Sequence, residues 1–325
     1  MKNLLLSILI VFISCDSANE APTNETNNEN NNNQNEVVTD TYKIVTANSE
    51  GKIFEIGNNT GTINQIGQIT TQDNLLMLTS FINFNTKIIC KEANIPLANV
   101  IYEYDKATNT TSTINITIPS SVTSTMNEPF LAQMTFDGNS ILAVVNENLP
   151  NSTHPSKIVA IDPETYTITD LEISFYQVGI TSLVYANDKL YMSSLNNGIL
   201  EVDLNLKTVT QITTTVGAST LAKIDNTTLS YTQLGGTNWV NACKPFEINL
   251  TNNVVTDKSQ NTFYSLGNIY SNGFCTDEEV LNLVFKQTNQ FGLLKLNYTT
   301  NEVKFVAINQ NSISVNAVII DKKNL

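Results

Sequence analysis

Few residues of this 325-residue chain have side chains suited to catalysis or to metal binding. All 17 basic residues are lysines, none is arginine, and His154 is the one histidine. Bidentate recognition of carboxylate or phosphate depends on arginine, and a multi-histidine metal site needs several histidines. The sequence therefore excludes both kinds of site. With a formal net charge of −13, we also expect no binding to a nucleic acid backbone.

Polar side chains that could bind a ligand gather in three segments, at residues 91–99, 146–156 and 234–244. The candidate ligand-binding residues in them are Glu92, Asn94, Glu147, Asn148, His154, Asn238 and Trp239. Trp239 is the sharpest candidate, because an exposed indole can stack on a sugar ring or anchor a protein partner. The alternative is that Trp239 packs between structural repeats, and that the other residues are solvated loop positions.

Catalytic motifs are missing from the sequence. No Gly-x-Ser-x-Gly nucleophile motif occurs. Glu92, Glu147 and Asn148 carry oxygens of the kind that calcium prefers, but no spacing marks them as a cage. We therefore expect no catalytic residue, no metal and no cofactor, with calcium admitted only if the protein is a metal-dependent hydrolase.

The elements that must position these segments form a repeat. Six segments share an alternating strand, a turn opened by an Asx residue or Gly, and a second alternating strand. The turn-opening residues are Gly57, Asp105, Asp162, Asp203, Asn249 and Asn297. They recur about every 48 residues, and Asx side chains favour this position because they hydrogen-bond backbone two residues further on.

A period of this length with about four strands per unit is typical of a β-propeller. The sequence predicts an all-β fold, a six-bladed β-propeller over residues 40–325 with four-stranded antiparallel blades. The first unit has only three strands, and residues 313–320 supply a candidate for its missing innermost strand. We therefore expect the C-terminal strand to close the first blade, in a propeller that is monomeric.

The N-terminus has the pattern of a secretion signal. A lysine is followed by the apolar run 4–13 and then by Ser14 and Cys15, which is too short for a membrane span of about 20 residues. The sequence Phe12-Ile13-Ser14-Cys15 resembles a bacterial lipobox of the relaxed Bacteroidota type, although Phe12 replaces the usual leucine. The resemblance implies a signal peptide at residues 1–14 and lipidation of Cys15. Ordinary secretory cleavage near Ser14 is the alternative.

Residues 15–39 contain many asparagines and no aromatic residue. Such a segment buries too little apolar surface to offset its ordering entropy, so the sequence predicts a disordered tether. Three further cysteines remain, Cys90, Cys243 and Cys275. We favour free thiols packed as small apolar groups over a disulfide between Cys243 and Cys275.

The chain as a whole resembles bacterial lipid-anchored β-propeller proteins. The resemblance implies a lipoprotein of the cell envelope, anchored in the outer membrane and facing either the periplasm or the cell surface. We expect a non-enzymatic protein whose loop face binds a protein partner or a neutral small molecule such as a glycan, for example in nutrient capture for an outer-membrane transporter. The alternative is a metal-dependent, lactonase-like hydrolase on the same face.

Replacing Cys15 with alanine should release the protein from the membrane fraction, because position 15 would then have no thiol for the lipidation that holds the protein there. Cell fractionation followed by immunoblotting measures this. The matched variant Cys275→Ala should stay with the membrane. A Cys15→Ala protein that also stays with the membrane would contradict lipidation.

Overall fold

The computed structural model describes residues 38–320 with interruptions. The residues that lie outside the description are 1–37, 70–77, 93–98, 125, 148–153, 177–178, 235–242, 259–264, 267–272, 277–278, 286–289, 310–312 and 321–325. The predicted signal peptide, Cys15 and the predicted tether therefore lie outside the described residues. Among the described residues, the one helix is α1 (Ser120–Thr123), and no helix is long and apolar enough to cross a membrane.

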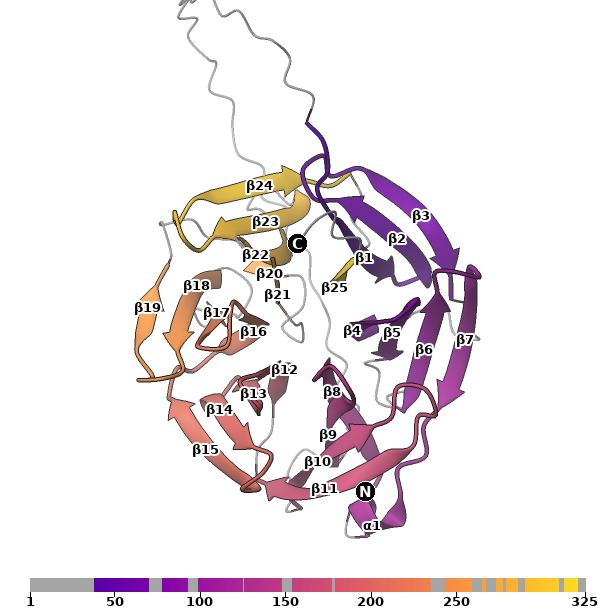
Figure 1. The fold of residues 1–325 in the computed structure, drawn as a ribbon, viewed down its shortest axis with the longest axis vertical. Coiled ribbons are helices and arrows are strands. Elements are labelled where there is room, and N and C mark those ends of the chain that lie inside the picture. Colours follow the sequence, from indigo (N-terminus) through magenta and orange to yellow (C-terminus); the bar gives the residue numbers. More distant parts are fainter. Residues whose placement is uncertain are drawn as a thin grey trace, which may run out of the picture. The chain divides into compact units, whose positions relative to one another are not determined.

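Six antiparallel sheets follow one another around a ring, which confirms the predicted six-bladed β-propeller (Figure 1). In each sheet we number the strands from the innermost outwards. Blade 1 consists of β25 (Ile313–Ile320), β1 (Lys43–Asn48), β2 (Lys52–Gly57) and β3 (Ile63–Gln68). Blade 2 consists of β4 (Leu78–Phe84), β5 (Lys87–Glu92), β6 (Val100–Asp105) and β7 (Thr110–Asn115). Blade 3 consists of β8 (Pro129–Phe136), β9 (Ile141–Glu147), β10 (Ser156–Ile161) and β11 (Ile168–Phe175).

The remaining blades follow the same order, with one departure. Blade 4 consists of β12 (Ile180–Ala186), β13 (Lys189–Ser194), β14 (Gly198–Asp203) and β15 (Thr208–Thr213). Blade 5 consists of β16 (Ala218–Lys223), β17 (Thr228–Leu234), β18 (Cys243–Asn249) and β19 (Val255–Asp257). Blade 6 consists of β20 (Ser265–Leu266), β21 (Phe274–Cys275), β22 (Glu279–Phe285), β23 (Phe291–Asn297) and β24 (Val303–Ala307). Its inner position is divided, because β20 and β21 both pair with β22.

The C-terminal strand closes the ring as predicted. β25 pairs antiparallel with β1, so that Lys43 lies opposite Ile320 and Thr46 lies opposite Ala317. Blade 1 thus combines the first three strands of the chain with its last one. The prediction that residues 313–320 provide the innermost strand of the first blade is confirmed.

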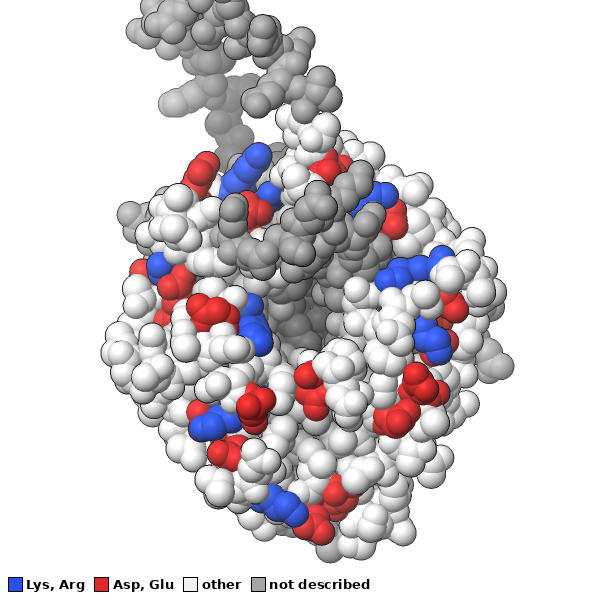
Figure 2. Space-filling model, in the orientation of Figure 1, with Lys and Arg blue, Asp and Glu red and all other residues white. Residues whose placement is uncertain are grey.

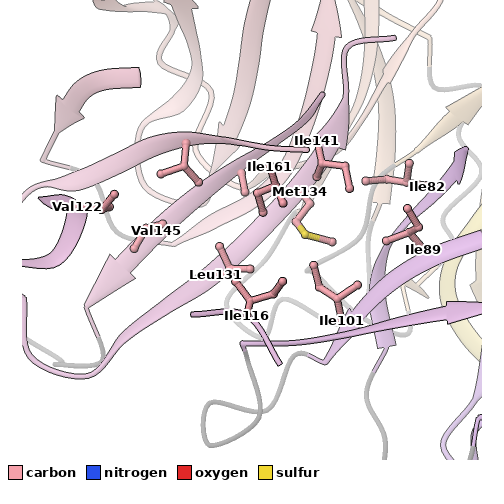
Figure 3. Packing of buried hydrophobic residues seen from close by; sticks show 12 residues of the cluster. Ile82, Ile89, Ile101, Ile116, Val122, Leu131, Met134, Ile141, Val145 and Ile161 are labelled. Atoms are coloured by element: carbon pink, nitrogen blue, oxygen red, sulfur yellow. The ribbon is translucent and has the colours of Figure 1, made fainter. Parts of the chain in front are cut away.

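Apolar side chains fill the spaces between neighbouring blades. The cluster between blades 2 and 3 contains Ile89 and Ile101 from one sheet and Leu131, Val145 and Ile161 from the other (Figure 3). Similar clusters join blades 1 and 2, 3 and 4, 4 and 5, 5 and 6, and 6 and 1. Because side chains alternate between the two faces of a strand, each sheet packs against both of its neighbours.

A lysine–glutamate ion pair repeats between the second and third strands of several blades. The pairs are Lys43 with Glu55 at 2.7 Å, Lys87 with Glu103 at 3.0 Å, and Lys189 with Glu201. Blade 6 exchanges the charges, with Glu279 on the second strand 3.0 Å from Lys295 on the third. Partly exposed pairs of this kind each contribute at most about 1 kcal/mol. The sequence analysis did not single out this repeated pair.

The turns between the third and fourth strands carry the predicted Asx hydrogen bonds. The Oδ1 atom of Asp162 accepts the backbone N–H groups of Glu164 and Thr165, at 2.9 and 2.8 Å. Equivalent bonds occur at Asp105, Asp203, Asn249 and Asn297. These bonds confirm the reason for Asx at this position in five of the six repeats.

Blade 1 has Gly57 at this position, and a carboxylate from elsewhere in the chain replaces the missing side chain. The Oδ1 atom of Asp40 accepts the N–H groups of Asn59 and Thr60, each at 2.9 Å. Burial opposes ionisation of Asp40, but these bonds outweigh it and hold its pKa below the usual value. A Cβ atom on Gly57 would lie 2.1 Å from Oδ2 of Asp40. Glycine is therefore required here to leave room for Asp40.

Three variants test whether Asp40 caps the turn of blade 1 in the way that the Asx side chains cap the turns of the other blades. Asp40→Ala and Gly57→Asp should each lower the free energy of unfolding by about 1 kcal/mol or more, the first through lost hydrogen bonds and the second through the steric clash. The double variant should recover most of the loss, because the carboxylate introduced by Gly57→Asp would then cap its own turn as in the other blades. Urea unfolding measures all three. A double variant that is as unstable as the sum of the single changes would contradict the explanation.

Candidate functional site

The second strands end and the third strands begin at one end of the ring, which we call the loop face. Three of the predicted site residues, Glu92, Glu147 and His154, are described by the structure. The other four, Asn94, Asn148, Asn238 and Trp239, lie outside the described residues. Their predicted roles in binding therefore stay predictions.

Glu147 and His154 meet at the loop face of blade 3. Glu147 is the last residue of β9, and its Oε2 atom lies 2.9 Å from Nδ1 of His154, just before β10. The Glu147 side chain is 1% exposed, whereas that of His154 is 37% exposed. The backbone N–H of Asn127 donates to Oε1 of Glu147 at 2.7 Å. A buried carboxylate thus forms a hydrogen bond with an imidazole that solvent can reach.

The chemistry of this pair follows from the carboxylate. When Glu147 is ionised its carboxylate only accepts hydrogen bonds, and Nδ1 of His154 is then the donor of the shared bond. In the neutral imidazole, Nε2 is then an acceptor, and in the protonated ring it is a donor. A ring whose orientation and tautomer are fixed in this way can hydrogen-bond a ligand or act as an acid or base.

Glu92 does not join this pair. It lies two residues after Cys90 on β5 and opposite Leu78 of β4. Both of these neighbours pack toward blade 1, so the alternation of side chains places Glu92 on the side of its sheet away from blade 3. Glu147 comes two residues after Val145, so both side chains lie on the same face of the sheet. Val145 packs toward blade 2. The two carboxylates thus belong to different junctions between blades.

No calcium site is assembled from the residues that the structure describes. Within the described ranges, no group of three or more His, Cys, Asp or Glu side chains is arranged to hold a metal ion. Since calcium takes six to eight oxygen ligands, Glu92 and Glu147 in separate junctions do not fit it. Cys90 and Cys275, in the described part of the chain, form no disulfide. The side chain of Cys243 lies outside the description.

The sequence analysis missed Lys91, which is buried beside the loop face. The residue is 1% exposed, and its Nζ donates to the backbone carbonyl of Glu92 at 2.7 Å. It lies opposite Thr79 and Ile101 in the sheet. Burial lowers its pKa to about 8, although the Glu92 charge acts in the opposite direction. Its place two residues after Ile89, on the face toward blade 3, is the signal that alternation could have given.

The side-chain amide of Asn99 also links blades 2 and 3. The Nδ2 atom of Asn99 donates to the carbonyl of Pro129 at 2.9 Å, and its Oδ1 accepts the N–H of Leu131 at 3.1 Å. Asn99 thereby ties the start of β6 in blade 2 to β8 in blade 3. Pro129 in turn lies opposite Glu147. The position of the Glu147–His154 pair is thus fixed by contacts between two blades.

Charged side chains are spread around the ring. On the face that Figure 2 shows, acidic and basic side chains lie interspersed around a central hollow, and no large basic patch is visible there. This distribution agrees with the ion pairs that repeat from blade to blade.

Replacing Lys91 with methionine should stabilise the protein, because a buried charge is replaced by an apolar side chain of similar length. Its pKa in the folded state is about 8, against an ordinary value of 10.5. Between these pH values the unfolded chain binds more protons, so the contribution of Lys91 to stability rises with pH. At pH 7 the variant should gain up to about 3 kcal/mol, and this gain should shrink toward pH 10.

Urea unfolding at pH 7, 8.5 and 10 measures the gain. Lys87→Met on the same strand is the matched control. The Lys87 side chain is 29% exposed and is paired with Glu103, so this control should not gain stability. A Lys91→Met variant that is destabilised at every pH would mean that the fold needs the amine.

Comparison with known proteins supports the fold. No protein-family model matches the chain, and no curated protein matches it in sequence. A proposed 6-phosphogluconolactonase from Bacteroides fragilis is similar in structure, with a TM-score of 0.51, 13% identity, and coverage of 86% of this chain and 98% of that one. Puromycin hydrolase matches with a TM-score of 0.49 and 8% identity over 81% of this chain. The match spans only 43% of puromycin hydrolase. At 13% identity, the likeness to the Bacteroides protein establishes the propeller fold alone.

Proposed function

We propose that the protein is a ligand-binding lipoprotein of the cell envelope whose loop face holds the ligand beside Glu147 and His154. The observation that carries this proposal is the contact of 2.9 Å between an imidazole that is 37% exposed and a carboxylate that is 1% exposed. Burying a carboxylate is costly unless it is hydrogen-bonded. Here that carboxylate holds an accessible ring in one orientation, as a binding site requires.

The charge of the protein narrows the ligand class. A net charge of −13 slows the approach of anions at low salt, and no arginine is present to pair with a carboxylate or phosphate. A neutral glycan or an uncharged patch of a protein partner therefore suits the site. The predicted loop residue Trp239 would add a stacking surface for such a ligand.

The proposed location follows from the N-terminal sequence. Lipidation at Cys15 and a tether over residues 16–39 would hold a monomeric propeller at the outer membrane, on its periplasmic or outer side. Capture of a nutrient for a neighbouring outer-membrane transporter is the role that we propose for such a protein.

Hydrolysis is the second candidate function, and the Glu147–His154 pair also favours it. An imidazole oriented by a carboxylate is a common general base. The structural neighbour from Bacteroides fragilis is a proposed 6-phosphogluconolactonase, so a lactone is the substrate to test. A phosphorylated substrate suits this chain poorly, because it lacks arginine.

An array of uncharged oligosaccharides tests the binding function. Glu147→Gln and His154→Gln should each weaken a bound saccharide about tenfold or more, which corresponds to about 1.4 kcal/mol. Glu164→Gln is the matched control, because it removes the same charge from an exposed turn at the opposite end of blade 3. Absence of any bound saccharide would exclude a glycan as the ligand, and saccharide binding at the loop face that survives both substitutions would contradict the proposal.

A lactone assay separates the two functions. Hydrolysis of glucono-δ-lactone by the wild-type protein that is lost in His154→Gln would establish the hydrolase. Hydrolysis no faster than the uncatalysed reaction, together with saccharide binding that depends on His154, would establish the binding protein.

A further inference from the structure

A second candidate site lies on the outer rim, away from the loop face residues described above. An open groove of about 440 Å³ runs between β3 of blade 1 and β7 of blade 2, which are neighbours along the rim in Figure 1. Its lining residues are Gln65, Ile66, Gly67, Gln68, Asn109 and Thr111. The volume falls within the range of about 300–1,000 Å³ that is usual for small-molecule sites.

The groove is shaped by a β-bulge and a glycine. The register of β2 and β3 shifts between Ile53 and Phe54, which leaves Ile66 as the extra residue of β3. The hydroxyl of Tyr104, on blade 2, donates to the carbonyl of Ile66 at 2.9 Å. A Cβ atom on Gly67 would lie 2.7 Å from the Tyr104 ring. The absence of a side chain at Gly67 therefore lets the ring pack against the backbone beside the groove.

Hydrogen bonds hold the polar side chains of the groove in place. Thr111 donates from Oγ1 to the carbonyl of Gln68 at 3.1 Å, which links the two strands. The Nε2 atom of Gln68 donates to the carbonyl of Glu50 at 2.6 Å, so that Oε1 is the acceptor that this amide offers to a ligand. The hydroxyl of Tyr104 also lies 3.2 Å from Oδ1 of the Asn109 amide.

The lining residues that the structure describes are all uncharged. Three amides and one hydroxyl among them provide both donors and acceptors, and no lysine and no carboxylate is among these described lining residues. An ionic ligand would find no counter-charge among these groups, and an apolar ligand would leave their polar atoms without partners. Paired hydroxyl groups of a sugar, which both donate and accept, match such a lining.

We propose that this groove binds an uncharged oligosaccharide of about two or three units, a length chosen to suit its volume. This site is separate from the Glu147–His154 pair, so it stands or falls independently of the proposed function. It would give the propeller a second point of contact with a glycan, at the junction of blades 1 and 2.

The experiment uses nuclear magnetic resonance titration of the full chain with maltotriose, cellotriose or chitotriose. At least one of them should cause saturable shifts at the backbone amides of Gly67, Gln68 and Asn109, at sugar concentrations up to about 10 mM. The double variant Gln65→Ala with Asn109→Gly should weaken this binding about tenfold or more. Glycine is chosen for position 109 because Asn109 has a φ of +55°, which glycine adopts without strain.

Gln211→Ala is the matched control. Gln211 lies opposite Leu200 in blade 4, the register that Gln65 holds opposite Phe54 in blade 1, and it is outside the groove. This control and His154→Gln should both leave groove binding unchanged. Absence of saturable shifts with all three sugars, or shifts confined to residues around His154, would overturn the groove proposal. The second result would at the same time support the loop face site.

Discussion

Every blade of this propeller relies on closure of the ring by the last strand. β25 hydrogen-bonds to β1, so the two ends of the propeller share one sheet. Polar contacts between blade 6 and blade 1 lie beside this sheet, because Lys295, which is 4% exposed, contacts Glu279 at 3.0 Å and Asn59 of blade 1 at 2.9 Å. The Tyr42 hydroxyl donates to the same Glu279 carboxylate at 3.2 Å.

Within the closed ring, hydroxyl groups join the inner strands of neighbouring blades. The register shifts in β4, β8, β12 and β16 leave backbone groups without a partner in their own sheet. The Oγ atom of Ser80 accepts the N–H of Met134 at 3.1 Å, and that of Ser182 accepts the N–H of Leu221 at 3.0 Å. Buried N–H groups need a hydrogen-bond acceptor. These serine hydroxyls supply it, and they link neighbouring blades where no ladder of backbone hydrogen bonds between the described strands does so.

Both candidate sites are products of junctions between blades. The groove needs β3 from blade 1 and β7 from blade 2 at a fixed separation, and the Tyr104 contact to Ile66 maintains it. The Glu147–His154 pair lies above the junction that Asn99 closes between blades 2 and 3. A single sheet would hold neither arrangement, since the partners come from separate repeats. Loss of ring closure would therefore be expected to disturb binding as well as stability.

The repeat, the number of blades, the closing strand and the Asx turns could all be predicted from the sequence, because each depends on local alternation or on a side chain that bonds backbone two or three residues away. The sequence also placed Glu147 and His154 in one loop. The tertiary structure was needed to show that Glu92 faces another junction, that Asp40 caps the turn of Gly57, and that a groove opens beside Tyr104. Some of these features join residues that lie apart in the chain, and the others depend on which face of a sheet meets its neighbour. The alternation of side chains within one strand does not determine how the next blade packs against that strand.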